Sequence, residues 1–292
     1  MPQESNNLYK TINDVPHLLN PSDGQYYPIL DERKKFADSG ASDCATPEVA
    51  EFEKEFDALA ASGKKEADLC RYGIFYKDSY QHNFRTGTVV ATDIICPQVA
   101  GGDFSTIMLL AAGNRASKSV MPWLMYVRQA GYILSLRDQS ISKMVLNFNA
   151  STLQDYLTEK QIEGTTHQVL SIQSQTFLKD PAQGGQWINL FYMYNHKKNV
   201  YSLIYSNEYK ASEDEQKVGD ECSWGTFVHA VSIHSFRTNP LGFDNTYLQE
   251  RDEQGVWSNF HLLTPDISDK HQYPGVEINL AFQHPNYGFA IN

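Results

Sequence analysis

The 292-residue sequence lacks most of the features that would assign a function directly. It has no apolar run near the roughly 18 residues that a membrane-spanning helix needs. Its first residues show no basic region followed by an apolar one, so we expect no signal peptide. It also has no G-x-S-x-G, Walker or H-E-x-x-H motif, which disfavours serine hydrolases, P-loop nucleotide-binding proteins and zinc peptidases.

Cysteine and positive charge are also scarce. The four cysteines stand far apart with no C-x-x-C pair, and the histidines show no metal-ligand spacing, so no metal and no cofactor is expected. The chain has 24 Lys and Arg against 35 Asp and Glu, a net charge of −11. Nucleic acid and anionic membranes would repel it, so neither is an expected partner. The cellular compartment stays open.

The first 70 residues differ in pattern from the rest. Residues 1–43 are rich in Pro, Asn, Asp and Ser without a sustained period, which is typical of an extended N-terminal arm. Residues 44–70 are expected to form a helical segment, in which Thr46 is the N-cap and Pro47 the first helical residue. Apolar residues then follow at spacings of 3, 4 and 3, which predicts one amphipathic helix: Val49, Phe52, Phe56 and Leu59.

From residue 71 to 292 the hydrophobic period is close to two. Segments such as 86–96, 123–128 and 132–137 are β-branched or alternating and end at Gly, Pro or Asn. A short helix is expected only within 151–163. Eight or more short strands with few helices predict an all-β fold, a concanavalin-like β-sandwich (jelly roll) that carries the N-terminal arm and the helix.

The positive charge is concentrated in one stretch of the acidic chain. Between Phe104 and Ala150 one acidic residue stands among five basic ones: Arg115, Lys118, Arg128, Arg137 and Lys143. Strand alternation puts Ser135 and Arg137 on one face, which we expect to lie opposite Met125 and Trp123. This distribution indicates a local anion site, or else ordinary charged strand edges.

A second hairpin is rich in tyrosine. In WINLFYMYNHKKNVYSLIYS, residues 196–199 are the expected turn. Tyr192 and Tyr194 would then oppose Leu203 and Tyr201, with Tyr205 further along the same face. Such a platform suits stacking of a sugar chain on the rings, and it is equally typical of plain cross-strand aromatic packing.

Three short motifs occur in an order that resembles jelly-roll alginate and glucuronan lyases: Lys118, then Ser135-Leu136-Arg137, then Tyr192-Met193-Tyr194. The tyrosine pair stands further along the chain than the family pattern places it. The resemblance implies β-elimination on a uronate polymer, in which Arg137, helped by Lys118, neutralises the carboxylate. Tyr192 or Tyr194 would then be base and acid, with His196 as a second candidate base. Substrate contacts would come from the remaining basic, serine and tyrosine residues: Arg115, Arg128, Ser135, Tyr201 and Tyr205.

The sequence thus predicts a polysaccharide lyase whose partner is an acidic polysaccharide or another glycan. Three alternatives stay open at this stage. The same surface could serve a lectin-like binding module without catalysis. The sandwich could enclose a small hydrophobic metabolite as an enzyme pocket, or the arm could make the chain an interaction protein.

Overall fold

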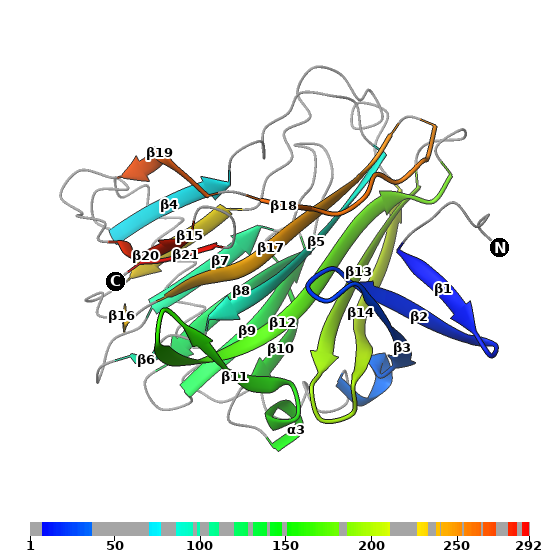
Figure 1. Ribbon diagram of the computed structural model, residues 1–292, viewed down its shortest axis with the longest axis horizontal. Helices are drawn as coiled ribbons and strands as arrows, with labels where there is room; N and C mark the ends of the chain where they lie inside the picture. Colours follow the sequence, from blue (N-terminus) through cyan, green and yellow to red (C-terminus); the bar gives the residue numbers. More distant parts are fainter. Residues whose placement is uncertain are drawn as a thin grey trace.

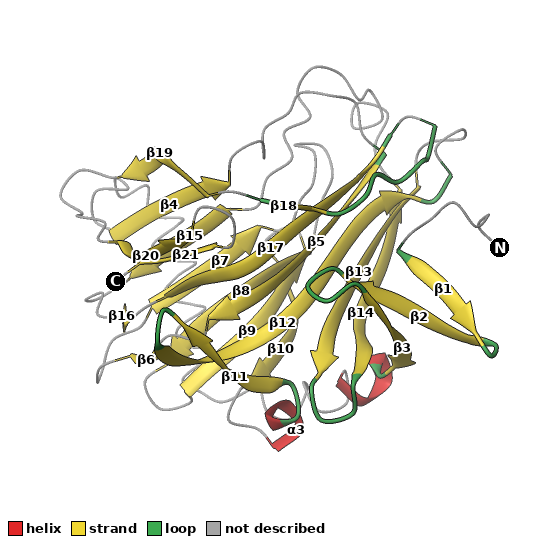
Figure 2. Cartoon of the chain, viewed as in Figure 1, coloured by secondary structure: helices red, strands yellow, loops and turns green. Residues whose placement is uncertain are grey.

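The computed structural model is built almost wholly of β-strands (Figures 1 and 2). It describes residues 8–36, 70–76, 86–95, 98–99, 105–110, 120–127, 131–138, 141–147, 151–180, 186–210, 227–232, 238–239, 241–252, 254–263, 265–272, 280–284 and 288–291. The expected β-sandwich class is confirmed. The helix expected within residues 44–70 lies outside the described residues. No described helix is long and apolar enough to cross a membrane.

The larger sheet has twelve strands. In spatial order its main path is β1 (Tyr9–Ile12), β2 (Val15–Asn20), β3 (Gln25–Asp31), β14 (Val200–Lys210), β13 (Gln186–Asn195), β12 (Thr165–Leu178), β5 (Gly87–Ile95), β17 (Leu241–Arg251), β21 (Gly288–Ile291) and β20 (Leu280–His284). Two further strands pair off this path, β11 (Leu157–Ile162) with β12 and β18 (His261–Leu262) with β17. All of these pairs are antiparallel except β3 with β14.

The second sheet has seven strands. Their order is β10 (Ile141–Asn147), β9 (Gly131–Asp138), β8 (Val120–Val127), β7 (Ser105–Leu110), β15 (Phe227–Ser232), β4 (Cys70–Tyr76) and β19 (Pro265–Gln272). A two-stranded ladder joins β6 (Gln98–Val99) to β16 (Thr238–Asn239). Because β13 of the larger sheet contacts β8 of the second, the two sheets form the layers of the sandwich.

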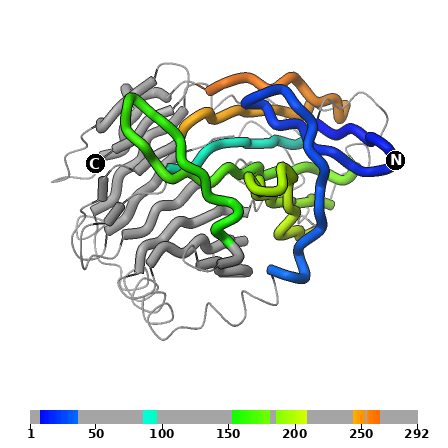
Figure 3. The backbone as a smooth tube through the Cα atoms, turned by 60° about the horizontal axis from the view of Figure 1, so that its bottom comes forward, coloured from blue at the N-terminus to red at the C-terminus, as the bar shows by residue number. Residues whose placement is uncertain are grey.

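Residues 9–31, within the expected extended N-terminal arm, form strands β1–β3 of the larger sheet. Asn13 and Asp14 join β1 to β2 with φ angles of 50° and 62°. Two consecutive positive φ angles give the two-residue turn whose twist suits a hairpin. Strands β1–β3 then curl over one face of the sheet (Figure 3). Leu8 and Leu18 are fully buried there against tyrosines of β13 and β14.

A second tight hairpin contains β11. Glu163 and Gly164 join it to β12, again with two positive φ angles, 49° and 78°. A short helix, α3 (Ser151–Gln154), precedes it. The helix expected within 151–163 therefore ends after one turn, and the rest of that segment is a strand.

The β8–β9 pairing differs from the expected register by two residues. Val127 pairs with Gly131, so the hairpin centres on residue 129 rather than 130. Ser135 therefore lies opposite Trp123, and Arg137 lies opposite Met121. The parity of the register is unchanged, so Ser135 and Arg137 still share a face.

Candidate functional site

A pocket of about 370 Å³ lies on the face of the larger sheet that the N-terminal strands cover. Its lining comes from the β2–β3 turn, β5, β11, β12, the β13–β14 hairpin and β17. The size is within the range of small-ligand sites. Most lining side chains carry a hydroxyl, amide, imidazole or carboxylate group, and Ala91, Val169 and Ile172 add apolar surface.

An ion triad forms one wall of the pocket. Asp93 of β5 and Asp244 of β17 are directly paired across adjacent strands. Two like charges in that position repel each other, but Lys160 of β11 bridges them, with Nζ 2.8 Å from Asp93 Oδ2 and 2.5 Å from Asp244 Oδ2. Burial lowers the pKa of Lys160, but the two carboxylates outweigh it, so the net pKa lies above its ordinary value. Lys160 is therefore fully charged at neutral pH.

A hydrogen-bonded chain leads from this triad to His196. Ser171 Oγ donates to Asp93 Oδ1 at 2.6 Å and lies 3.3 Å from His196 Nε2. Because the serine has one proton and gives it to Asp93, it accepts from His196, which places the imidazole proton on Nε2. Burial lowers the pKa of His196 against the opposing pull of Asp93, so the ring is neutral near pH 7.

A bulge and a turn complete the rim. Asn245 lies in a bulge of β17 between Asp244 and Tyr247, with a φ of 49°, and lines the pocket. Bulges commonly redirect a side chain in this way. On the other side, Asp23 of the β2–β3 turn accepts a 2.7 Å hydrogen bond from Tyr27 Oη and one from the backbone N–H of Gln25. The rim carboxylate is thus held by neutral donors.

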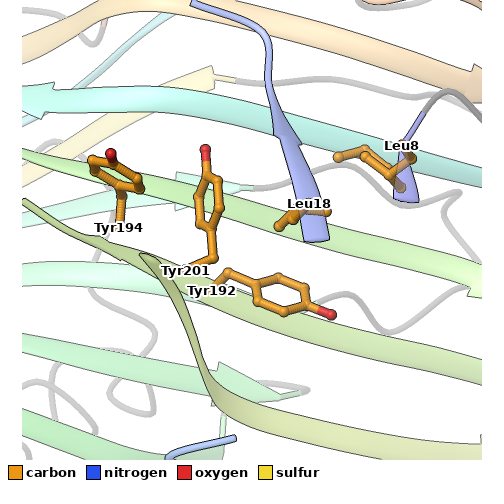
Figure 4. Close-up of a cluster of buried hydrophobic side chains, with 6 residues drawn as sticks. Leu8, Leu18, Tyr192, Tyr194 and Tyr201 are labelled. Carbon is orange, nitrogen blue, oxygen red and sulfur yellow. The ribbon is translucent and has the colours of Figure 1, made fainter. Parts of the chain in front are cut away.

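The structure confirms part of the expected tyrosine arrangement on the β13–β14 hairpin. Tyr194 pairs with Tyr201, and Tyr192 pairs with Leu203. A bulge follows, so Tyr205 pairs with Phe191 and belongs to the opposite face. The other three tyrosines do not form an open platform, because they are buried under β1–β3 (Figure 4).

The electrostatics of these phenols are opposite to the expected ones. Burial raises the pKa of Tyr192 to about 12 and raises that of Tyr194 as well. A phenolate base needs a lowered pKa, which neighbouring Arg and Lys were expected to supply. Tyr194 and Tyr201 line the pocket and Tyr192 does not.

The basic residues expected at the site are not brought to this pocket. Ser135 and Arg137 lie on β9 in the second sheet, and no residue of β9 is part of the pocket lining. Arg115, Lys118 and Arg128 lie outside the described residues. Of the ten expected site residues, three line the pocket: Tyr194, His196 and Tyr201.

Sequence reasoning missed the residues of the ion triad and Ser171. One signal was present, since Asp93 is the single charged residue in the β-branched segment 86–96. A charge inside such a strand is rarely buried unless it is paired. Its partners Lys160 and Asp244 are distant in sequence, so alternation alone could not find them. Among the described residues no group of three or more His, Cys, Asp or Glu could hold a metal ion.

Comparisons with known proteins give structural neighbours only. No protein-family model and no curated protein matches the chain. Among solved structures, a scytalido-glutamic peptidase bound to a peptide-based transition-state analogue aligns at 8% identity and a TM-score of 0.37, covering 76% of this chain and 97% of that one. SCP-B, a member of the eqolisin family of peptidases, aligns at 8% identity with a TM-score of 0.39 and the same coverage of both chains. Tailspike protein 2 of the Escherichia coli O157:H7 bacteriophage CAB120 aligns at 11% identity with a TM-score of 0.28. The alignment covers 61% of this chain and 21% of that one.

The polysaccharide-lyase hypothesis is wrong. The structural neighbours are peptidases and a tailspike, not alginate or glucuronan lyases. The geometry gives the physical reason, since Arg137 is on a different sheet from Tyr192 and Tyr194 and the phenols have raised pKa values. Similarities of 8–11% identity with TM-scores below 0.4 assign no activity to this chain.

Proposed function

We propose that the pocket binds an organic cation, a ligand with an ammonium or guanidinium group. The observation that carries the proposal is the charge of the lining. Three carboxylates, Asp23, Asp93 and Glu159, line the pocket together with one lysine. That lysine is already shared between Asp93 and Asp244.

Two of the lining carboxylates have no salt bridge to any described residue. Within the described part of the chain, neither Asp23 nor Glu159 has a cationic partner, and Asp23 is held by neutral donors alone. A concave site lined by excess charge of one sign concentrates ligands of the opposite sign. The neutral state of His196 leaves this negative field undiminished at pH 7.

Aromatic groups add a second attraction for a cation. Tyr194 and Tyr201 line the pocket, with ring centroids 5.1 Å apart in an edge-on arrangement. The negative face of an aromatic ring attracts an ammonium or guanidinium group, by about 0.5–2 kcal/mol depending on desolvation. Carboxylates and ring faces together are a usual combination for cation recognition. A uronate would meet the same carboxylates as a like charge.

A charge series of small molecules tests the proposal by isothermal titration calorimetry. The probes are agmatine, 1,4-butanediol and succinate, which carry cationic, neutral and anionic groups on a four-carbon chain. We expect agmatine to bind and the other two not to bind. Binding should weaken between 50 and 500 mM NaCl, because the Debye length shrinks from roughly 14 Å to about 4 Å.

Two results would overturn the proposal. One is equal binding of the diol and agmatine, which would assign recognition to hydrogen bonding without charge. The other is binding of succinate in preference to agmatine. Glu208→Gln is the matched protein control, since this exposed carboxylate pairs with Lys179 and does not line the pocket.

A further inference from the structure

Tyr201 is a tightly packed side chain of the pocket. Its exposed fraction is 3%, and its ring lies edge-on to three others, those of Tyr27, Tyr192 and Tyr194, with centroids 6.5, 6.5 and 5.1 Å away. Figure 4 shows its hydroxyl pointing away from the strand beside that of Tyr194. Packing on this scale fixes the position of the hydroxyl before any ligand arrives.

The hydroxyl of Tyr201 differs from those of its neighbours in its hydrogen bonding. Tyr194 Oη donates to Asn199 Oδ1 at 3.2 Å, Tyr27 Oη donates to Asp23, and Tyr192 Oη lies 3.1 Å from Tyr9 Oη. Within the described ranges Tyr201 Oη has no such partner. Buried tyrosine hydroxyls usually have one, so this group is available to something in the pocket.

The hydroxyl also keeps its proton. Burial raises the pKa of Tyr201 well above its ordinary value, and the negative charges of Asp93 and Asp23 raise it further. The group is therefore a donor at any physiological pH. A donor needs an acceptor, and a bare ammonium group has no lone pair to offer.

We infer that Tyr201 Oη donates a hydrogen bond to an oxygen atom of the ligand, so that the pocket selects oxygen-bearing amines over simple alkylamines. This inference rests on the proposed function and narrows its ligand class. The cation is attracted by the carboxylates of Asp23 and Glu159. The oxygen atom, in a hydroxyl, ether or carbonyl group, accepts the hydrogen bond from Tyr201 Oη.

The test compares amines that differ by one oxygen. Cyclohexylamine is the oxygen-free probe, and the isomers of 2-, 3- and 4-aminocyclohexanol carry the added hydroxyl at different distances from the same ammonium group. We expect at least one isomer to bind the wild-type chain about 2–13-fold more tightly, which is the size of one hydrogen bond. Tyr201→Phe should remove this preference and leave the affinity for cyclohexylamine unchanged.

A structural role of the hydroxyl predicts different readouts. Tyr201→Phe would then lower the melting temperature and weaken both classes of amine equally. Under our inference its melting temperature equals that of the wild type, because within the described ranges the hydroxyl has no hydrogen bond to lose. Tyr205→Phe is the matched control, since it removes a phenol from the opposite face of the same strand and Tyr205 does not line the pocket, and it should leave both affinities unchanged.

The two proposals fail in different ways. If the wild type binds every aminocyclohexanol and cyclohexylamine equally, the inference about Tyr201 is overturned and cation binding stands. If no amine binds at all, both are overturned. If Tyr201→Phe keeps the preference for the hydroxylated amine, another residue binds the oxygen atom and the assignment to Tyr201 is wrong.

Discussion

Tyr9 and Tyr192 are 183 residues apart in the sequence, and their hydroxyls lie 3.1 Å apart in the structure. Tyr9 Oη also donates to Gln175 Oε1, and Gln173 Nε2 donates to the backbone carbonyl of Leu19. These contacts attach the N-terminal strands to β12 and β13. Since the β2–β3 turn supplies Asp23 to the pocket, docking of these strands is a condition for the site to exist.

The first prediction concerns this docking. Leu18→Ala should lower the free energy of unfolding by about 2–4 kcal/mol, because the side chain is fully buried among the tyrosines. Val15→Ala, in the same strand but 41% exposed, should change it by less than about 0.5 kcal/mol. Urea titration measures both, and equal losses for the two variants would show that β2 is not anchored through Leu18.

The second prediction concerns the ion triad. Lys160→Met leaves two carboxylates facing each other, one of them with a side chain only 7% exposed. Breaking a buried ion pair on one side costs about 3–5 kcal/mol, and partial exposure of Lys160 puts this case at the lower end. Thermal unfolding should show the loss. Lys179→Met, which removes an exposed partner of Glu208, should cost less than about 1 kcal/mol, and a similar loss in both variants would contradict a structural role for the triad.

The third prediction is a pH dependence at Glu32. Burial raises the pKa of its carboxyl, but hydrogen bonds donated by Ser202 and Tyr156, with Lys35 nearby, outweigh this and leave it below 4.5. A carboxyl whose pKa is lower in the folded state stabilises the fold at neutral pH, and this contribution is lost as the pH falls through the folded pKa. Melting temperatures of wild type and Glu32→Gln should therefore differ most at neutral pH and converge as the pH falls through the folded pKa of Glu32.

The control for this pH series is Glu208→Gln, because Glu208 is exposed. The melting temperature of Glu208→Gln should differ little from that of the wild type at every pH. A gap between wild type and Glu32→Gln that stays constant from pH 7 to pH 3 would mean that the Glu32 carboxylate contributes nothing to stability through its charge.

Local patterns predicted the sheet better than the site. The β13–β14 pairing followed from alternation and a polar turn at 196–199, because a four-residue turn fixes which residues face each other. The β8–β9 turn has several residues that could centre it, so the register of Ser135 was two residues off. The bulge that turns Tyr205 to the other face has no sequence signature of its own.

The site depends on contacts between distant residues. Asp93, Lys160 and Asp244 come from three strands spread over 151 residues of the sequence, and only the sheet order brings them together. Burial of the tyrosines depends on β1–β3 curling over them, which the composition of residues 1–43 did not indicate. The pKa values of the tyrosines were therefore misjudged in direction, since desolvation cannot be read from neighbours in sequence.

The most direct test of the central claim is the affinity of Asp23→Asn for agmatine, measured by calorimetry beside Glu208→Gln. Both variants lose one negative charge, but only Asp23 lines the pocket. We predict a loss of about 5–10-fold for Asp23→Asn, as expected for one charge near a partly desolvated site, and no change for Glu208→Gln. Equal affinities in Asp23→Asn and wild type would contradict cation binding in this pocket.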